Sequence, residues 1–243
     1  MMQDNRLHIL FLCAGKGTRL HPLTKSVPKP LLSLGEITIL ERLIRQSLTA
    51  FNVESIWVNT SYLPEKICSH LAKMESNTLN ILWEPTILGS ASTLLEISKR
   101  VTGDILVIHG DLVLSNSYID ELSKKVYSAK KSFVVCHLRD STDARSVVQV
   151  STDGNVKSLR EKYKGRKGHQ VLSNSGIYFF LANEDLSASK GLDIVNSQLQ
   201  SLISSNLLGS AVIHNPRVSV DSLYSLEQAV ILANGDKLMK LLW

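Results

Sequence analysis

A short apolar strand that runs straight into a glycine-rich loop constrains this chain more than any other stretch. The run Leu7–Leu12 is almost wholly apolar and ends abruptly at Gly15. Such a run is typical of a buried strand in an α/β sheet, and these sheets bind ligands at the carboxyl ends of their strands. The loop that follows is therefore the first candidate for a binding site.

The composition of this loop suits a phosphorylated ligand. Gly15, Gly17 and Thr18 let the backbone pass close to a phosphate chain and offer N–H groups to its oxygens. Arg19 and Lys29 add two positive charges nearby. The sequence therefore predicts an anion-binding loop.

Two commoner glycine motifs do not fit this loop. A Walker loop needs a glycine five residues before its Gly-Lys pair and a Ser or Thr after it, but Leu10 and Gly17 occupy those positions. A dinucleotide fingerprint needs a third glycine where this chain has Leu20. A P-loop is excluded, and hydride transfer is disfavoured.

From Leu12 to Leu31 the chain resembles the signature of the sugar-1-phosphate nucleotidylyltransferases, and within them the short mannose- and heptose-1-phosphate guanylyltransferases. The signature runs Leu-x-Ala-Gly-x-Gly-Thr-Arg-Leu-x-Pro-Leu-Thr and then Pro-Lys-Pro-Leu. The matching positions are Leu12, Ala14, Gly15, Gly17, Thr18, Arg19, Leu20, Pro22, Leu23, Thr24, Pro28, Lys29, Pro30 and Leu31. By this resemblance, the positions from Leu12 to Arg19 bind the nucleotide. Arg19 and Lys29 also act in catalysis, and Lys29 contacts the sugar phosphate.

Length and composition agree with a globular α/β protein. A chain of 243 residues with 44% hydrophobic content can bury a sizeable core. A short polar N-terminus and the lack of a long apolar run predict a cytoplasmic protein without signal peptide or membrane partner. Three scattered cysteines indicate neither disulfides nor a zinc site. The net charge of +5 is dispersed, so we expect no nucleic acid partner; a homodimer stays open.

Periodicity predicts alternating strands and helices after the signature loop. We expect strands in Val53–Asn59, Leu79–Trp83, Asp104–Asp111, Phe133–His137 and Ala211–His214, and a hairpin that pairs Val147–Val150 with Val156–Leu159. We expect helices at Thr38–Ala50, from Pro64, after Ala91, and at Tyr118–Ala129, Leu192–Leu207 and Leu226–Leu242. The predicted fold is one Rossmann-like three-layer α/β/α domain, with a mostly parallel sheet and a small β-rich sugar-side lobe. Residues 1–138 would form the nucleotide core, 139–222 the sugar-binding part and 223–243 a C-terminal helix.

Two carboxylates are candidates for a divalent metal. Asp111 lies just past the end of a predicted strand and resembles the family's Gly-Asp element, whose Asp holds Mg²⁺ between the phosphates. Asp221 lies where the family has a second metal carboxylate, although the residues after it differ. Each could instead cap a following helix. A glycosyltransferase of similar architecture would carry Asp-x-Asp where this chain has Asp111-Leu-Val, which disfavours that class without excluding it.

The segment from Glu84 through Gly89 and Ser90 resembles the family's base-binding turn, Glu-x-x-x-Leu-Gly-Thr-Ala. A carboxylate only accepts hydrogen bonds, and the Watson-Crick edge of guanine offers two adjacent donors, whereas uracil offers one donor between two carbonyls. Glu84 therefore favours GTP. The alternatives are a solvated or helix-capping Glu84 with base recognition by main-chain groups near Gly89, and UTP or CTP as the donor.

Two later motifs resemble the family's sugar-binding elements. Glu161-Lys162 matches Glu-Lys-Pro, with Tyr163 in place of Pro, and the segment from Asn174 to Tyr178 resembles Asn-Ala-Gly-Ile-Tyr. By resemblance, Glu161 and Asn174 bind sugar hydroxyls and Lys162 contacts the sugar phosphate. As bare residues, Glu161 and Lys162 could equally be a surface ion pair.

These motifs imply an enzyme that transfers a nucleoside monophosphate from an NTP to a sugar 1-phosphate, in nucleotide-sugar and polysaccharide biosynthesis. A phosphate oxygen of the sugar would attack the α-phosphorus and release pyrophosphate, with Mg²⁺ on Asp111 and Asp221. Arg19, Lys29 and Lys162 would offset the repulsion between the anions. The alternative is a noncatalytic sensor of nucleotides or sugar phosphates, suggested by the altered positions Ser146, Tyr163 and Leu223.

Overall fold

The computed structural model describes residues 6–142, 144–161, 168–189 and 191–241. The chain folds into two compact units that alternate along the sequence. Unit 1 contains Leu88–Val107 and Lys124–His214, and unit 2 contains Arg6–Ile87, Ile108–Ser123 and Asn215–Trp243. The functional parts expected at residues 1–138, 139–222 and 223–243 stay a prediction.

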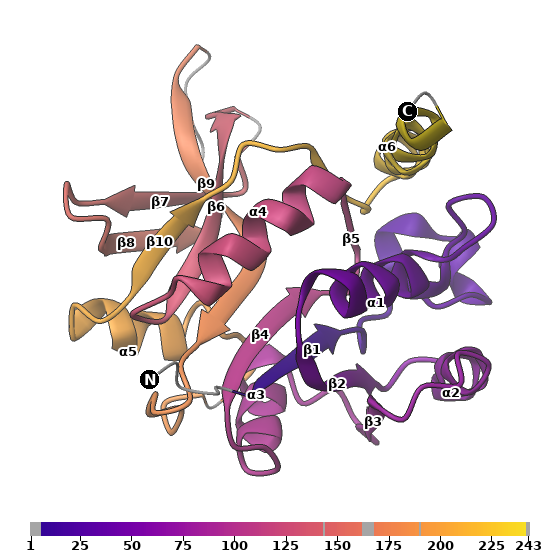
Figure 1. Cartoon of the computed structure of the whole chain (residues 1–243), viewed down its shortest axis with the longest axis horizontal. Coiled ribbons are helices and arrows are strands. Elements are labelled where there is room, and N and C mark those ends of the chain that lie inside the picture. Colours follow the sequence, from indigo (N-terminus) through magenta and orange to yellow (C-terminus); the bar gives the residue numbers. More distant parts are fainter. Residues whose placement is uncertain (1–5, 143, 162–167, 190, 242–243) are drawn as a thin grey trace. The chain divides into compact units, whose positions relative to one another are not determined.

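Unit 2 begins with a β-α-β-α-β arrangement. Strands β1 (Leu7–Leu12), β2 (Val53–Thr60) and β3 (Leu79–Trp83) pair in parallel in that order. Helices α1 (Ile39–Ala50) and α2 (Pro64–Ala72) connect them, and Figure 1 shows the three strands side by side with both helices close by. β1 is buried along almost its whole length, as a continuous apolar run predicts for a parallel strand covered on both faces.

Local signals explain where the helices of unit 2 begin. The Thr38 hydroxyl accepts a hydrogen bond from the Glu41 amide at 3.1 Å, which caps the first turn of α1. α1 then buries Leu40 and Leu43 on its apolar face. Pro64 opens α2, a position where its missing N–H costs no helix hydrogen bond.

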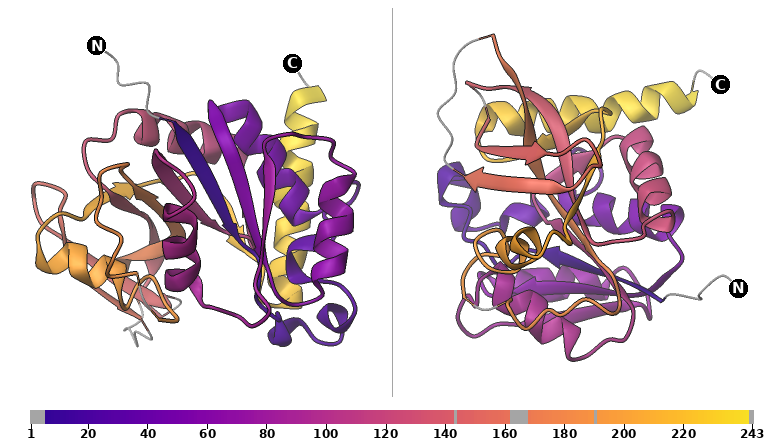
Figure 2. Two further views of the ribbon diagram at one scale, coloured as in Figure 1. Left: turned by 90° about the horizontal axis from the view of Figure 1, so that it is seen from below. Right: turned by 90° about the vertical axis from the view of Figure 1, so that its left-hand side faces the viewer.

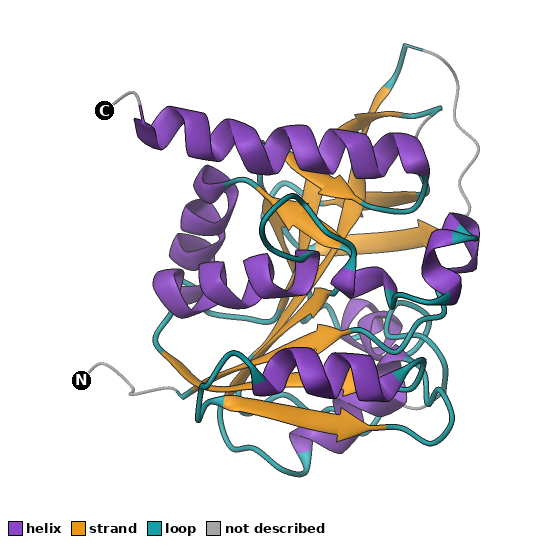
Figure 3. Cartoon of the chain, turned by 90° about the vertical axis from the view of Figure 1, so that its right-hand side faces the viewer, coloured by secondary structure: helices purple, strands orange, loops and turns teal. Residues whose placement is uncertain are grey.

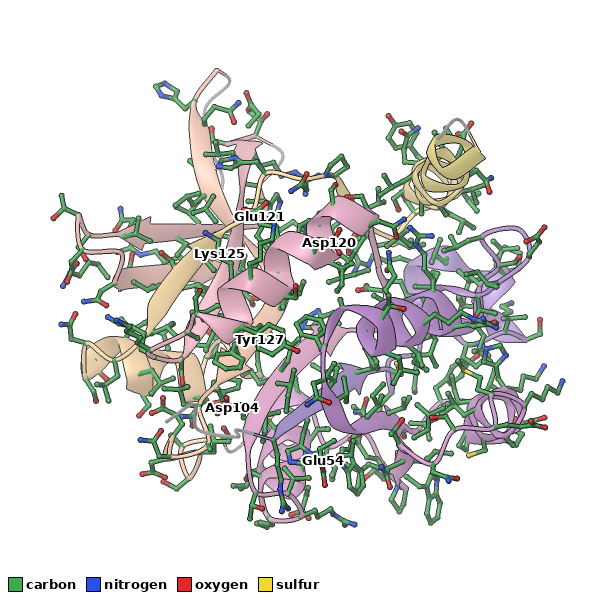
Figure 4. The ribbon with its side chains drawn as sticks, in the orientation of Figure 1. Glu54, Asp104, Asp120, Glu121, Lys125 and Tyr127 are labelled. Atoms are coloured by element: carbon green, nitrogen blue, oxygen red, sulfur yellow. The ribbon has the colours of Figure 1, made fainter. Side chains whose placement is uncertain are left out.

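A two-stranded antiparallel ribbon in unit 2 was not expected from the sequence. It pairs β5 (Leu112–Leu114) with β11 (Arg217–Ser219), and each strand is too short to show an alternating pattern. Helix α4 (Asn116–Tyr127) starts soon after β5, and its Glu121, labelled in Figure 4, accepts from the Asn215 side chain at 2.6 Å. Helix α6 (Leu223–Leu241) follows β11 as one long unbroken helix (Figure 2).

Unit 1 is richer in antiparallel pairing. β6 (Phe133–Asp140) pairs antiparallel with β9 (Gln170–Phe180) and parallel with β10 (Gly209–Val212). The hairpin of β7 (Ser146–Val150) and β8 (Val156–Glu161) joins β9 through β7. These strands are the β-rich part that the sequence predicted.

The remaining elements of unit 1 are β4 and two helices. β4 (Asp104–His109) has its last two residues in unit 2, and its Asp104, labelled in Figure 4, accepts from the Ala182 amide at 2.8 Å. The helices are α3 (Ser90–Ser98) and α5 (Gln198–Ser204).

The predicted α/β class is confirmed, and Figure 3 shows the alternation of helices and strands by colour. Several predicted boundaries differ from the observed ones, and three of them bear on the units described above. α5 begins at Gln198 rather than Leu192, because the preceding segment is bonded to the turn before α3. α6 begins at Leu223 rather than Leu226, and the last strand of unit 1 is Gly209–Val212. Within the described residues no helix is long and apolar enough to cross a lipid bilayer.

Candidate active site

The signature loop leaves β1 as an exposed segment between two buried anchors, Ala14 and Leu20. Gly17 has φ +64°, and a Cβ there would lie 3.1 Å from the Lys29 Cβ, so this position needs glycine. The Gly17 carbonyl accepts from the Leu20 amide at 2.9 Å and from the Thr24 hydroxyl at 2.8 Å. By contrast, nothing lies within 4 Å of a Cβ built on Gly15. The loop is therefore fixed from behind and open at Gly15.

Lys29 and Asp111 form a close ion pair in unit 2. The Lys29 ammonium donates to Asp111 Oδ2, and Lys29 is only 9% exposed. Burial raises the pKa of Asp111, but the charges of Lys29, His109 and Arg217 outweigh it and hold that pKa below its ordinary value. Asp111 is therefore an ionised carboxylate at neutral pH.

Arg19 and Asp221 form a second cation–carboxylate pair. Arg19 Nη1 lies 3.5 Å from Asp221 Oδ2, and the Arg19 side chain is 63% exposed. The Asp111 carbonyl accepts from the Val220 amide at 2.9 Å, next to the β5–β11 ribbon. The ribbon thus brings the backbone at Asp111 next to that preceding Asp221.

Serine hydroxyls accept from amides in the first turns of the helices that follow the two aspartates. The Ser115 hydroxyl accepts from the Tyr118 amide at 3.1 Å ahead of α4. The Ser222 hydroxyl accepts from the Ser225 amide, also at 3.1 Å, ahead of α6. Each helix start is thus capped by a serine.

The chemistry of Asp111 fits a divalent metal. Its Oδ1 is buried and has no hydrogen-bond partner within the described residues, and such an orphaned anionic acceptor suits a hard cation. No cluster of three or more His, Cys, Asp or Glu in the described part of the chain is arranged for a metal. Asp111 and Asp221 as the two metal ligands stay a prediction.

Two basic residues beside Asp111 were not predicted as site residues. Arg217 lies on β11, and His109 ends β4; both lower the Asp111 pKa. No local pattern marks Arg217, because its relation to Asp111 arises only from the pairing of β11 with β5.

Glu84, the predicted base-binding residue, is buried in unit 2. It is 1% exposed, and its Oε1 accepts a hydrogen bond from Asn59 Nδ2 at 2.8 Å. The predicted pairing needs both carboxylate oxygens to face the two donors of guanine. One oxygen is thus bonded to the buried amide of Asn59, a residue that the sequence did not single out, and the pairing of Glu84 with guanine stays a prediction.

In unit 1, Gly89 and Ser90 have internal partners. Gly89 has φ +89°, and a Cβ there would lie 2.4 Å from the Leu192 Cα. The Ser90 amide donates to the Leu192 carbonyl at 3.0 Å, and its hydroxyl accepts from the Ile194 amide at 3.0 Å. Glycine is thus required by close packing, and the nucleotide contacts of both residues stay predictions.

The predicted sugar-binding residues also lie in unit 1. Glu161 is exposed at the end of β8, and Lys162 is outside the described residues. Asn174 Oδ1 accepts from the Gly176 amide at 2.8 Å, and its Nδ2 donates to the Tyr178 hydroxyl at 2.9 Å. Burial raises the Tyr178 pKa, so this partner is a neutral phenol. One N–H of the Asn174 amide is left over by these two bonds.

The predicted residues thus divide between the units. Unit 2 holds Leu12, Ala14, Gly15, Gly17, Thr18, Arg19, Lys29, Glu84, Asp111 and Asp221, while unit 1 holds Gly89, Ser90, Glu161 and Asn174. The ion pairs of unit 2 join the signature loop and the segment after it to both candidate metal ligands. The catalytic and metal-binding roles of these residues stay predictions.

Comparison with known proteins defines the class. The profile of the nucleotidyl transferase family matches residues 9–213, and the chain belongs to this family. The predicted family and enzyme class are confirmed at that level.

Particular relatives support this assignment. The bifunctional protein GlmU of Methanococcus aeolicus is 34% identical over 171 residues, which are 70% of this chain and 39% of that protein. A mannose-1-phosphate guanylyltransferase of Mycobacterium tuberculosis is 27% identical over 75% of this chain and 51% of its own length. The chain thus spans about half or less of the length of these relatives.

The fold resembles solved structures as well. HddC from Yersinia pseudotuberculosis superposes with a TM-score of 0.75 at 20% identity, covering 92% of this chain and 98% of that one. HddC has also been solved in complex with GMP-PN.

Proposed function

We propose that this protein transfers a nucleoside monophosphate, with GTP as preferred donor, to a sugar 1-phosphate, in an Mg²⁺-dependent reaction that releases pyrophosphate. The main support for this proposal is the presence of two ion pairs in unit 2. Lys29–Asp111 and Arg19–Asp221 place two cations and two carboxylates on and around the signature loop. A reaction between two anionic phosphates needs these groups.

Each residue of the site has a distinct task in this mechanism. The open backbone at Gly15 and the N–H groups after it bind the triphosphate. Arg19 is exposed and only loosely paired at 3.5 Å, so it can turn from Asp221 to a phosphate oxygen. Lys29 is buried and held by Asp111, so its charge is fixed in place before substrates arrive.

A bound Mg²⁺ would neutralise charge on the phosphates and polarise the α-phosphorus. Asp111 Oδ1 and the carboxylate of Asp221 would hold it. No covalent nucleophile on the protein is required, because the phosphate of the sugar is itself the nucleophile.

The proposed preference for GTP rests on relatives rather than on Glu84. A relative is named a mannose-1-phosphate guanylyltransferase, and HddC has been solved with GMP-PN. Because Glu84 is bonded to Asn59, we assign recognition of the base to main-chain groups near Gly89. UTP or CTP remains the alternative donor. The cytoplasmic location, the homodimer and the part in polysaccharide biosynthesis stay predictions.

A pyrophosphate-release assay with GTP, UTP, CTP and dTTP against a panel of sugar 1-phosphates tests this proposal. We expect release that needs both substrates and Mg²⁺, is fastest with GTP, and stops on adding EDTA. No release from any pair would favour the noncatalytic sensor suggested by Ser146, Tyr163 and Leu223. Calorimetric titration with GTP and mannose 1-phosphate would then measure whether the protein binds either one.

A further inference from the structure

A buried chain of hydrogen bonds links the ends of three adjacent strands of unit 2, and these bonds have no role in the reaction proposed above. The Cys13 amide, just after β1, donates to Asn59 Oδ1 at 2.6 Å. Asn59 Nδ2, near the end of β2, donates to Glu84 Oε1 at 2.8 Å. Glu84 follows β3 directly, and its own amide donates to the Thr60 carbonyl at 2.8 Å. Asn59 and Glu84 are 3% and 1% exposed.

The two partners of Asn59 leave its amide a single orientation. A backbone N–H can bond only to the amide oxygen, and a carboxylate can bond only to the amide nitrogen. The Cys13 amide and Glu84 therefore select the same orientation of Asn59, with its oxygen toward Cys13 and its nitrogen toward Glu84. Without an acceptor at position 84, the Asn59 side chain would lose the bond from its Nδ2 and be held less firmly against the Cys13 amide.

The position of the Cys13 backbone affects where the signature loop begins. It precedes Ala14 and Gly15, the first residues of the signature loop. On its other side, a Cβ built on Gly110 would lie 2.3 Å from Cys13 Sγ, and the Gly110 amide donates to the Leu12 carbonyl at 3.0 Å. The start of the loop is thus held between Asn59 and the residue that precedes Asp111.

We infer that Glu84 is a positioning residue, which acts through Asn59 to fix the Cys13 amide and with it the phosphate-binding start of the signature loop. The inference rests on the proposed function, and it replaces base recognition by Glu84 with a role that is the same for every NTP. A displacement of about 1 Å at this loop would misplace the triphosphate and reduce turnover.

The test compares Glu84→Ala, Glu84→Gln, Asn59→Ala and the double variant Asn59→Ala/Glu84→Ala, with kcat and KM measured for GTP and UTP. We expect Glu84→Ala and Asn59→Ala each to lower kcat/KM by about ten- to a hundredfold. The loss should be equal for GTP and UTP. The double variant should lose no more than the worse single variant, since both break one chain. Glu84→Gln should retain more activity than Glu84→Ala, because its amide oxygen can still accept from Asn59.

The matched control is Glu54→Ala, which removes an exposed carboxylate from the same strand as Asn59 (Figure 4) and should change neither constant. A change in the GTP/UTP ratio in Glu84→Gln or Glu84→Ala would overturn the inference in favour of base recognition. Fully additive losses in the double variant would also overturn it, because the residues would then act separately.

Hydrogen exchange separates this inference from the proposed function. Glu84→Ala and Asn59→Ala should speed amide exchange at Cys13 and in the loop after it, while Glu54→Ala should not. If the wild type releases no pyrophosphate from any NTP, the proposed function fails, and the exchange result alone decides the inference. Unchanged exchange at Cys13 in both variants would contradict it.

Discussion

The polar residues around the signature loop in unit 2 differ in their bonding from the candidate residues in unit 1. In unit 2, Arg19 and Lys29 face carboxylates, and the buried Asp111 Oδ1 has no hydrogen-bond partner within the described residues. In unit 1, Ser90 and Asn174 bond to neighbouring residues of their own unit. Unit 2 thus concentrates charged groups around the signature loop, whereas the candidate residues of unit 1 are neutral groups bonded within their own unit.

The family motifs follow the same division. The signature from Leu12 to Leu31 matches at every fixed position, but Ser146 and Tyr163 depart from the family's pattern. Activation of a phosphate imposes the same requirements on every member, while the acceptor differs from one member to another. We therefore expect mutations in unit 2 to affect the reaction itself, and mutations in unit 1 to affect the acceptor.

The largest expected effect is at the metal carboxylates. Asp111→Asn should lower Mg²⁺-dependent kcat by about a thousandfold or more, because a neutral amide cannot balance a divalent cation. Asp221→Asn should behave likewise. The matched control is Asp104→Asn, whose amide oxygen can still accept from Ala182. An unchanged kcat in Asp221→Asn would mean that the second metal ligand lies elsewhere. An unchanged kcat in Asp111→Asn would contradict a catalytic role for unit 2.

The next effect concerns the exposed cation of the loop. Arg19→Ala should lower kcat by about a hundredfold, since it removes a charge directed at the transferring phosphate. Lys25→Ala, which deletes a nearby exposed cation, should leave kcat within about threefold. Similar losses in both variants would show that the loop contributes only a diffuse positive field.

A smaller effect is expected in unit 1. Asn174→Ala should raise KM for the sugar 1-phosphate by about tenfold, which corresponds to one lost hydrogen bond, and leave KM for GTP unchanged. The control is Ser158→Ala on β8, which removes an exposed hydroxyl bonded to Gln149. If Asn174→Ala lowers only the melting temperature, the amide is structural and the sugar is bound elsewhere.

The smallest effect tests the scaffold behind the signature loop. His70 Nε2 lies 3.1 Å from the Thr38 hydroxyl and 3.7 Å from Glu41 Oε2. Burial lowers the pKa of His70. The Glu41 carboxylate partly opposes this by raising the pKa, and the charge of Lys73 lowers it further. A lowered histidine pKa means that the unfolded chain binds more protons, so the stability contributed by neutral His70 is lost as pH falls below about 6.5.

Wild type should therefore lose about 1–2 °C more in melting temperature than His70→Gln between pH 7.5 and pH 5.5. Differential scanning fluorimetry at both pH values measures this. An equal loss in the two proteins would mean that His70 does not titrate differently in the folded chain.

The sequence predicted those parts of the fold and site that depend on local patterns. The strand at Leu7–Leu12 and the helix over Thr38–Ala50 follow from apolar periodicity and a threonine cap. The signature loop was found because its chemistry lies in one continuous stretch. Asp111 was found because a carboxylate at the end of a buried strand is unusual.

The parts that the sequence did not predict depend on strand pairing over long separations. The β5–β11 ribbon joins residues about a hundred positions apart through strands of three residues, which carry no periodic signal. Asn59 and Glu84 are paired only because parallel strands end at one edge in a particular register. The late start of α5, at Gln198 rather than at Leu192, likewise follows from the packing of Leu192 against Gly89.

The central claim is attack on the α-phosphorus of a nucleoside triphosphate at the site in unit 2. Incubation with mannose 1-phosphate, Mg²⁺ and GTP that carries a radioactive α-phosphate tests it directly. We expect labelled GDP-sugar and unlabelled pyrophosphate with the wild type, and neither product with Asp111→Asn. Label that stays in GTP or appears in GDP, without labelled GDP-sugar, would contradict it.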